Sequence, residues 1–392
     1  MRLDPFRCNR QHPSDSGWVA SARPRFTTLS PDRETVLSFD LEGRPISWFE
    51  AGRTYKRSLA SVVHGRERVG GQRRRFVVGD TEAAGLFARL LDRVREAPRE
   101  RLPEDARGRI DGILRWTPET LLAERERFEA AYAPVSILPP DQYLAIVVQA
   151  THGCTWNRCT FCNFYQDRRF EVRSAEVLAD HLARVADLLG DAAAIRRRLF
   201  LADGNALALS IDRLRPIVDT ARAVFPGRPW SGFVDVFTGE RKTVDDWRAL
   251  RDHGLDRVYV GLETGHGPLL TFLNKPGTPD EAGSFLTVLK EAGVRVTVIL
   301  MAGAGGERYA EGHVRDTLAL VGGLPLGPGD LVYLSPFVEH AGSEYVRRAR
   351  SEGVGALADE DREAQAIELR DRLRAALPGV QVARYDIREF VY

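Results

Sequence analysis

From about residue 140, short apolar runs rich in β-branched and aromatic residues alternate with longer segments whose apolar residues recur every three or four positions. The apolar runs span residues 143–151, 197–202, 231–237, 257–262, 294–302 and 330–337. The segments between them, such as 174–189 and 211–225, are long enough for helices that cross back over a sheet. The repeat of roughly 35–40 residues is typical of βα units. The pattern predicts an α/β fold, a partial (β/α)6 TIM-like barrel.

Residues 1–138 follow a different pattern. Apolar and polar residues alternate over 35–59 around a turn at Glu42 to Pro45, which predicts a hairpin in a small sheet. Helical periodicity with acidic first turns predicts helices at 81–96 and 117–132.

Prolines and the pattern near the C-terminus divide the chain into three predicted regions. The pair Pro139-Pro140 marks a boundary, and a charged amphipathic helix at 359–377 precedes an expected last strand in 380–392. We therefore expect a smaller α+β N-terminal domain at 1–138, the barrel core at 139–345, and a C-terminal helix and strand extension at 346–392.

Composition excludes several classes of protein. The chain has 392 residues and is 43% hydrophobic, which is enough for a large core. Its 56 basic and 55 acidic residues nearly balance, so net charge indicates neither nucleic acid nor membrane as a general partner. No stretch approaches the roughly 20 apolar residues of a membrane span, and the opening residues lack the apolar core of a secretion signal. We expect a cytoplasmic protein.

Three of the four cysteines lie close together after the first apolar run. Cys154, Cys159 and Cys162 stand in HGCTWNRCTFC with the spacing C-x4-C-x2-C, and Cys8 is far upstream. Four cysteines are too few for a disulfide scaffold in so long a chain. The spacing therefore predicts a metal or cluster site.

Several metal centres compete for this loop. Structural zinc normally takes four protein ligands, yet the sequence has no second cysteine pair, and His152 is separated from Cys154 by one residue. An electron-transfer cluster also normally uses four cysteines, which would require Cys8. Three thiolates on a four-iron cluster leave one iron open for chemistry. The pattern favours the open-site cluster, with zinc or a fortuitous group of cysteines as the alternatives.

The segment GCTWNRCTFC, followed by a predicted βα barrel, resembles the radical S-adenosylmethionine (radical SAM) superfamily. The family's usual spacing is C-x3-C-x2-C, and the longer loop through Trp156-Asn157-Arg158 resembles the Pro-Trp-Asn type of one branch. The resemblance implies a [4Fe-4S] cluster on the three cysteines, with S-adenosylmethionine (SAM) on the open iron. It also implies that Phe161, before the last cysteine, packs the loop near adenine; the alternative role for Phe161 is in the core.

Three further segments at predicted strand ends resemble ligand-binding segments of the family. LADGNALAL resembles the Gly-Gly-Glu-Pro segment that receives the methionyl ammonium. Because Asn205 lacks the charge of the family's glutamate, we expect Asp203 to supply it; a simple turn is the alternative. GLETGHG resembles a segment that approaches the ribose and amino acid portion, and VILMAGAGGER one that leaves room for adenine. The matching residues are Asp203, Gly204, Asn205, Glu263, Thr264, Gly303, Gly305 and Gly306.

The resemblance implies an enzyme that reductively cleaves SAM to a 5′-deoxyadenosyl radical, which abstracts hydrogen from a substrate. The expected partners are a small-molecule substrate and an electron donor such as a flavodoxin or ferredoxin. The sequence identifies no catalytic residue. Five polar residues near strand ends are candidates for the substrate cavity, each with a purely structural alternative: Asp235, Tyr259, Ser335, Glu339 and His340.

A run of basic residues from Arg53 to Arg75 suggests a second version of the function. It could hold phosphates or carboxylates, although such runs are more often solvated surface. One alternative is therefore a radical enzyme that modifies RNA. Another is a non-catalytic iron-sulfur or metal-binding protein. We find no cobalamin-binding segment.

Overall fold

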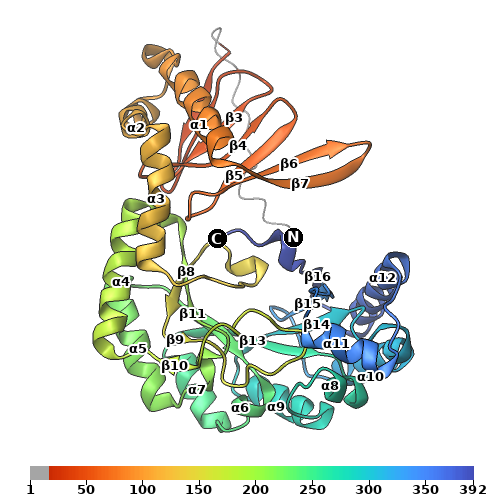
Figure 1. Ribbon diagram of the computed structural model, residues 1–392. Helices are drawn as coiled ribbons and strands as arrows, with labels where there is room; N and C mark the ends of the chain where they lie inside the picture. Colours follow the sequence, from red (N-terminus) through yellow and green to blue (C-terminus); the bar gives the residue numbers. More distant parts are fainter. Residues whose placement is uncertain (1–16) are drawn as a thin grey trace. The chain divides into compact units, whose positions relative to one another are not determined.

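The computed structural model describes residues 17–392, so Cys8 lies outside the described residues. The chain divides into two compact units (Figure 1). Within the described range, residues 17–133, 184–196 and 391–392 form the N-terminal unit, and residues 134–183 and 197–390 form the barrel unit. The helix at 175–189 contributes to both units. No helix among the described residues is long and apolar enough to cross a membrane.

The barrel unit is built on a parallel sheet of seven strands in the order β8-β11-β12-β13-β14-β15-β16. The strands are β8 (Ala145–Gln149), β11 (Arg198–Ala202), β12 (Trp230–Val234), β13 (Leu255–Glu263), β14 (Arg295–Ala302), β15 (Leu331–Pro336) and β16 (Gln381–Arg384). The first six match the six apolar runs, which confirms the predicted partial barrel. Their interior positions are almost all buried, as expected for a parallel sheet covered by helices.

The seventh strand corrects the predicted strand count. β16 was expected in a separate C-terminal extension, but it pairs in parallel with β15 along Leu331↔Gln381 to Leu334↔Arg384. The crossover that returns the chain to the sheet is α12 (Asp359–Ala376), which packs over β14, β15 and β16. The extension therefore completes the same sheet, and Val382 is buried in it.

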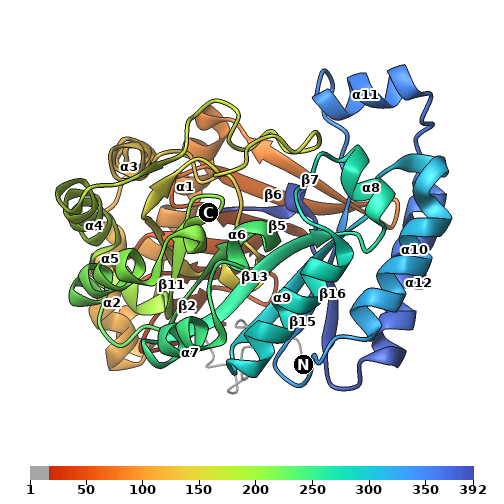
Figure 2. The same cartoon turned by 90° about the horizontal axis from the view of Figure 1, so that it is seen from below.

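Helices cover the outer face of this sheet (Figures 1 and 2). They are α4 (Ala175–Leu189), α5 (Ile211–Val224), α7 (Val244–Asp252), α9 (Pro279–Glu291), α10 (Gly306–Gly322) and α12. The helices α6 (Val236–Gly239), α8 (Gly267–Phe272) and α11 (Glu344–Glu352) lie in the segments that follow β12, β13 and β15. Capping boxes at Thr243 and Thr278 start α7 and α9 at their observed ends. A short ladder of β9 (Thr151–His152) and β10 (Glu171–Val172) closes the base of the cysteine loop.

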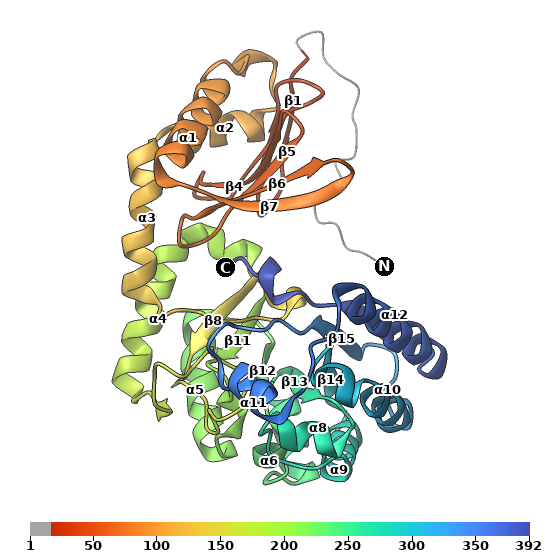
Figure 3. The ribbon, with the colours of Figure 1, turned by 45° about the vertical axis from the view of Figure 1, so that its right-hand side comes forward.

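The N-terminal unit contains a seven-stranded antiparallel meander in sequence order. Its strands are β1 (Val19–Ala22), β2 (Thr27–Ser30), β3 (Val36–Phe39), β4 (Pro45–Glu50), β5 (Arg53–Arg57), β6 (Val63–Val69) and β7 (Gln72–Val78). The predicted hairpin is present as β3 and β4, within a larger sheet than expected. Helices α1 (Asp80–Arg95), α2 (Glu104–Leu114) and α3 (Pro118–Ala131) follow the strands (Figure 3).

One face of the meander packs against these helices. Leu37, Trp48 and Tyr55 lie side by side across three strands and form a core with Leu86 and Phe87 of α1. The Trp48 and Tyr55 rings stack with centroids 5.2 Å apart.

Short 3-10 turns occur at Arg99–Arg101, Pro140–Gln142, Gly190–Ile195, Ala206–Ala208 and Ile387–Glu389.

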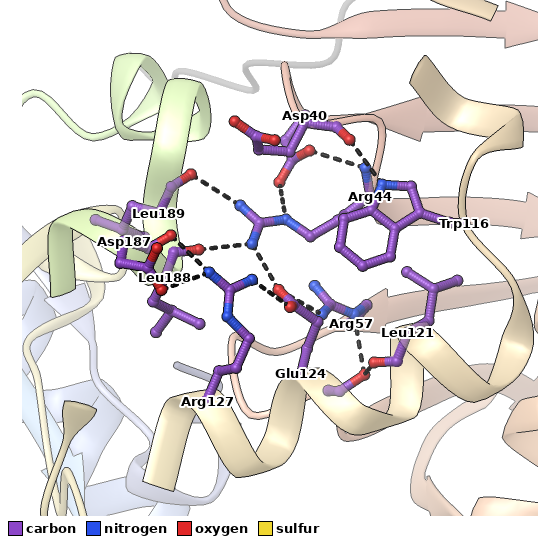
Figure 4. Close-up of polar contacts among 12 residues, drawn as sticks. Asp40, Arg44, Arg57, Trp116, Leu121, Glu124, Arg127, Asp187, Leu188 and Leu189 are labelled. Atoms are coloured by element: carbon purple, nitrogen blue, oxygen red, sulfur yellow. Dashed lines mark hydrogen bonds and ion pairs between the residues drawn. The ribbon is translucent and has the colours of Figure 1, made fainter. Parts of the chain in front are cut away.

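A buried arginine holds the C-terminal end of α4 within the N-terminal unit (Figure 4). The guanidinium of Arg44 bonds the carboxylates of Asp40 and Glu124 at 2.9 and 2.7 Å. It also donates to the carbonyl oxygens of Leu188 and Leu189 at 2.7 and 3.0 Å. A helix ends with unpaired carbonyls that carry partial negative charge, so a buried cation satisfies them here.

Candidate active site

A cavity of about 200 Å³ opens at the carboxyl ends of the barrel strands. Its wall is mainly apolar, with residues such as Phe161, Phe233, Ile299, Met301 and Phe337. The ionisable and thiol side chains in its wall are Cys154, Cys159, Cys162, Tyr165, Asp235, Glu263, Lys275, His340 and Tyr385. All of these belong to the barrel unit. In (β/α) barrels this end of the sheet carries the chemistry.

The three cysteines lie on one loop that follows β9. Gly153 starts the loop with φ +78°, where a Cβ atom would lie 2.8 Å from the carbonyl oxygen of Arg169. The loop doubles back on itself through Asn157, whose Nδ2 donates to the carbonyl oxygens of Tyr165 and Arg168 at 2.6 and 3.2 Å. These contacts hold the three thiols toward one cavity.

The loop is also tied to the residues that follow α8. Trp156 Nε1 donates to the carbonyl oxygen of Asn274 at 2.8 Å, and Asn274 Nδ2 donates to that of Arg158 at 2.8 Å. The amide of Thr160 donates to the carbonyl oxygen of Leu273 at 3.0 Å. The residues that lengthen this loop thus form the contacts that fasten it to the barrel. The unusual spacing therefore has a structural role.

The three cysteines are half-buried, and their thiols lie close enough to influence one another. Burial raises the pKa of Cys159 to about 12 and that of Cys162 to about 11. Both are therefore protonated at neutral pH until a metal displaces the protons. Among residues 17–392, no three histidine, cysteine or acidic side chains gather closely enough to hold one metal ion. The donor set is soft, as iron-sulfur clusters require, and the three thiols face a common space.

Asp203 holds the base of the cysteine loop through hydrogen bonds. Its Oδ2 accepts a hydrogen bond from the amide of Gly153 at 3.1 Å and lies 3.5 Å from Nη1 of Arg168. Its Oδ1 accepts from Gln149 Nε2 at 3.4 Å. Burial raises the pKa of this carboxyl although the hydrogen bond and Arg168 oppose the shift. Asp203 is not part of the cavity wall, whereas the adjacent Gly204 is.

Gly204 is required by close packing. A Cβ atom at this position would lie 2.6 Å from the Tyr165 ring and 3.1 Å from the Cβ of Cys154. Contacts under 3.0 Å to a ring cannot be accommodated without displacement of the loop. The absence of a side chain therefore lets the end of β11 approach the first cysteine.

Asn205 and Asp235 form one polar unit across β11 and β12. The Asn205 Nδ2 bonds Asp235 Oδ2 and, at 2.7 Å, the hydroxyl of Thr155. Its Oδ1 accepts from the amide of Asp235 at 3.1 Å. Asp235 in turn caps α6 by accepting from the amide of Thr238 at 2.7 Å. Both Asn205 and Asp235 line the cavity, so the carboxylate near the expected ligand segment comes from β12.

Glu263 lies at a bulge of β13 in the left-handed conformation, with φ +65°. Its carboxylate turns back over Gly261, where a Cβ atom would lie 2.6 Å from Oε1. Oε1 is 3.6 Å from the Nζ of Lys275. Burial opposes the charge of Lys275, but the Glu263 carboxylate outweighs it and raises the pKa of this lysine. The predicted cavity carboxylate thus has a buried cationic partner.

The next residue points away from the cavity. The Thr264 hydroxyl lies 2.7 Å from Nδ1 of His313 and accepts from the amide of His266 at 3.0 Å, so it packs against α10. The space beside the glycines after β14 is also filled by other residues of the protein. A Cβ atom at Gly303 would meet Arg362 of α12 at 2.6 Å, and one at Gly306 would meet the carbonyl oxygen of Gly355 at 1.8 Å. Neither Thr264 nor Gly303 lines the cavity.

Of the five substrate-cavity candidates, the structure brings Asp235, Ser335 and His340 to the cavity wall. The Tyr259 hydroxyl instead donates to Asp141 Oδ2 at 2.5 Å, and Glu339 is not in the wall. The sequence reasoning missed Lys275 and Tyr165. A usable signal existed for Lys275, because it is one of only four lysines in the chain and lies 12 positions after Glu263.

Part of the barrel unit matches a known protein family. Residues 148–318 match the sequence model of the Radical SAM superfamily, a range that includes the cysteine loop and β11 to β14. No curated protein matches the chain.

Solved structures with a similar fold include coproporphyrinogen III oxidase (HemN) from Escherichia coli, which is 16% identical with a TM-score of 0.43. That match covers 64% of this chain and 55% of HemN. Methylornithine synthase (PylB) is 15% identical over 61% of this chain and 70% of its own, with a TM-score of 0.41. The cobalamin-dependent S-adenosylmethionine radical enzyme OxsB is 15% identical, with a TM-score of 0.38.

The OxsB match covers 56% of this chain but only 30% of OxsB, so this chain spans about a third of that protein. The family match and the C-x4-C-x2-C loop identify residues 148–318 as a radical SAM domain.

Proposed function

We propose that the barrel unit holds a [4Fe-4S] cluster on Cys154, Cys159 and Cys162, binds SAM at the open iron, and directs radical chemistry at a small-molecule substrate. One observation carries this proposal. Three thiols of a single loop face one cavity at the carboxyl ends of the strands, together with the charged side chains of Asp235, Glu263 and Lys275.

When bound, the cluster supplies the electron that cleaves SAM to methionine and a 5′-deoxyadenosyl radical. The protein's own part is to position and enclose the reactants. Trp156, Asn157 and Asn274 hold the loop through the hydrogen bonds described above. An external reductant such as a flavodoxin or ferredoxin would deliver the electron.

The contacts to SAM are assigned by which side chains face the cavity. Asp235 is a cavity carboxylate held by neutral donors, so it suits the methionyl ammonium. Lys275, beside Glu263, suits the methionyl carboxylate. The ring of Phe161 lines the cavity and suits packing against adenine. Asp203, Thr264 and Gly303 lie outside the cavity wall and act indirectly, by shaping the loop and the helices around the site. Gly204 is in the wall, where its lack of a side chain leaves room for Cys154.

The substrate would occupy the apolar part of the cavity. Phe233, Ile299 and Met301 line it, and such a wall excludes water from a reactive carbon radical. Ser335 and His340 are the polar groups on the β15 side that could orient a bound molecule. A small molecule with a largely apolar reacting part fits this wall.

Product analysis tests the proposal. The protein is reconstituted anaerobically with iron and sulfide, reduced with dithionite and supplied with SAM. We expect 5′-deoxyadenosine and methionine from the wild type and from Cys8→Ala, and neither from Cys159→Ala. A protein that contains the cluster but forms neither product would be a non-catalytic iron-sulfur protein, which would overturn the proposal.

A further inference from the structure

The two faces of the sheet in the N-terminal unit carry different charged side chains. Strand alternation places Trp48, Tyr55 and Phe76 on the face covered by helices. The acidic strand residues Glu50 and Glu67 share that face by register. On the opposite face of β5, β6 and β7 the ionisable side chains are all basic: Lys56, His64, Arg66, Arg68, Arg73 and Arg75. We call this surface the basic face.

The register sets like charges directly opposite one another on the basic face. Arg66 pairs with Arg75, and Arg68 pairs with Arg73, across the β6-β7 hairpin. Directly opposed like charges destabilise a sheet. The hairpin is the long arm of the sheet seen in Figures 1 and 3. No carboxylate of the described residues pairs with Arg68 or Arg73, so folding alone does not favour their opposition, and a bound anion is the simplest compensation for it.

The acidic residue within the hairpin does not neutralise this face. Glu67 pairs with Arg53 at 2.8 Å and with Arg74 at 3.8 Å on the other side of the sheet. In the part of the chain that the structure describes, Arg66, Arg68 and Arg73 form no ion pair, and all three are exposed. Their guanidinium groups are available to an external partner.

We propose that the basic face binds a single strand of nucleic acid through its phosphates. Residues on one face of a strand recur every two positions, or roughly 6.8 Å, which suits successive phosphates of an extended chain. Arginine binds phosphate through two hydrogen bonds, and its planar group also stacks on bases. Phe49 lies on the same face, 38% exposed, and offers a ring for stacking.

The apolar content of the face favours nucleic acid over a membrane surface. The exposed large apolar side chains on this face are Val36 of β3, Phe49 of β4 and Val77 of β7. These three side chains are too little apolar surface for insertion into lipid, and the described residues of the face include no amphipathic helix. The binding concerns the N-terminal unit and does not depend on the radical chemistry proposed for the barrel unit.

The experiment measures fluorescence anisotropy of a labelled oligouridylate with the full-length protein over a range of salt concentrations. The test variant is Arg66→Gln/Arg68→Gln/Arg73→Gln. The control is Arg93→Gln/Arg95→Gln/Arg99→Gln, which removes the same charge from α1 and the turn after it. Each phosphate contact contributes about 0.7 to the slope of log Kd against log salt. We expect the test variant to lose about 2 from that slope and to bind at least about tenfold more weakly near 0.1 M salt.

The control variant should bind within about twofold of the wild type. The thermal unfolding midpoint of the test variant should stay the same or rise, because opposed arginines are removed. Equal weakening by both variants would show a general effect of net charge and would overturn the proposal. So would an absence of binding by the wild type at low salt. Binding to phosphatidylserine vesicles, but not to oligouridylate, would assign the face to membranes instead.

Discussion

The carboxylate of Asp203, at the end of β11, accepts a hydrogen bond from the amide of Gly153, at the start of the cysteine loop, over 3.1 Å. This bond makes Asp203 a support for the loop. We expect Asp203→Ala to lower the iron content after reconstitution, because the loop loses its anchor, and to lower the free energy of unfolding by about 1–3 kcal/mol. Asp203→Asn keeps an acceptor and should recover most of the iron. Full iron content in Asp203→Ala with weakened SAM binding would instead make Asp203 a direct ligand.

Gly204 offers a test of packing at the same strand end. We expect Gly204→Ala to reduce iron content severalfold, because the new methyl group would press on Tyr165 and on Cys154. Gly108→Ala is the matched control, since its Cβ atom meets nothing within 4 Å on α2. That control should be stabilised by about 0.5–1 kcal/mol and keep its iron. Equal iron content in both variants would contradict the packing argument.

The buried pair of Glu263 and Lys275 predicts a strong coupling between two substitutions. Lys275→Met leaves the Glu263 carboxylate buried without its partner, and we expect it to cost about 3–5 kcal/mol in urea unfolding. Glu263→Gln/Lys275→Met removes both charges and should regain most of that loss, yet still bind SAM at least about tenfold more weakly than the wild type. Additive effects of the two single substitutions on stability would show that the side chains do not interact.

His313 predicts how stability depends on pH. Burial lowers the pKa of this side chain from 6.5 to about 4. Between those values the unfolded chain binds a proton that the folded protein does not bind. Stability should therefore fall as pH drops from about 6.5 to about 4, by up to about 3 kcal/mol from this residue. Urea unfolding of the wild type and His313→Gln at pH 7.5 and 4.5 checks this. The same pH dependence in both proteins would exclude His313 as the cause.

The sequence predicts those parts of the fold that strong local patterns specify. Six strands of the barrel unit are apolar runs, and each is found where expected. β16 has four residues, and only its pairing with β15 places it in the sheet. Helix α2 was not predicted, because Gly108 and Gly112 weaken its helical pattern. Long-range pairing and tertiary packing decide these elements, and neither can be read from a local pattern.

In the candidate site, too, local sequence patterns predicted some features and tertiary packing decided the others. Spacing alone singled out the cysteines, and strand ends correctly located the segments around them. The sequence did not predict which way each side chain points. Glu263 and Thr264 are neighbours, but one faces the cavity and the other faces α10, because a bulge with positive φ turns the chain between them. Lys275 reaches the cavity from beyond α8, which no strand-end argument could anticipate.

The most direct test of the central claim is electron paramagnetic resonance of the reduced, reconstituted protein with and without SAM. Three cysteine ligands leave one iron free for SAM, so we predict a [4Fe-4S]⁺ signal whose g values shift when SAM is added. Cys159→Ala should show no such signal, and Cys8→Ala should behave like the wild type. A cluster signal that does not respond to SAM would contradict the account.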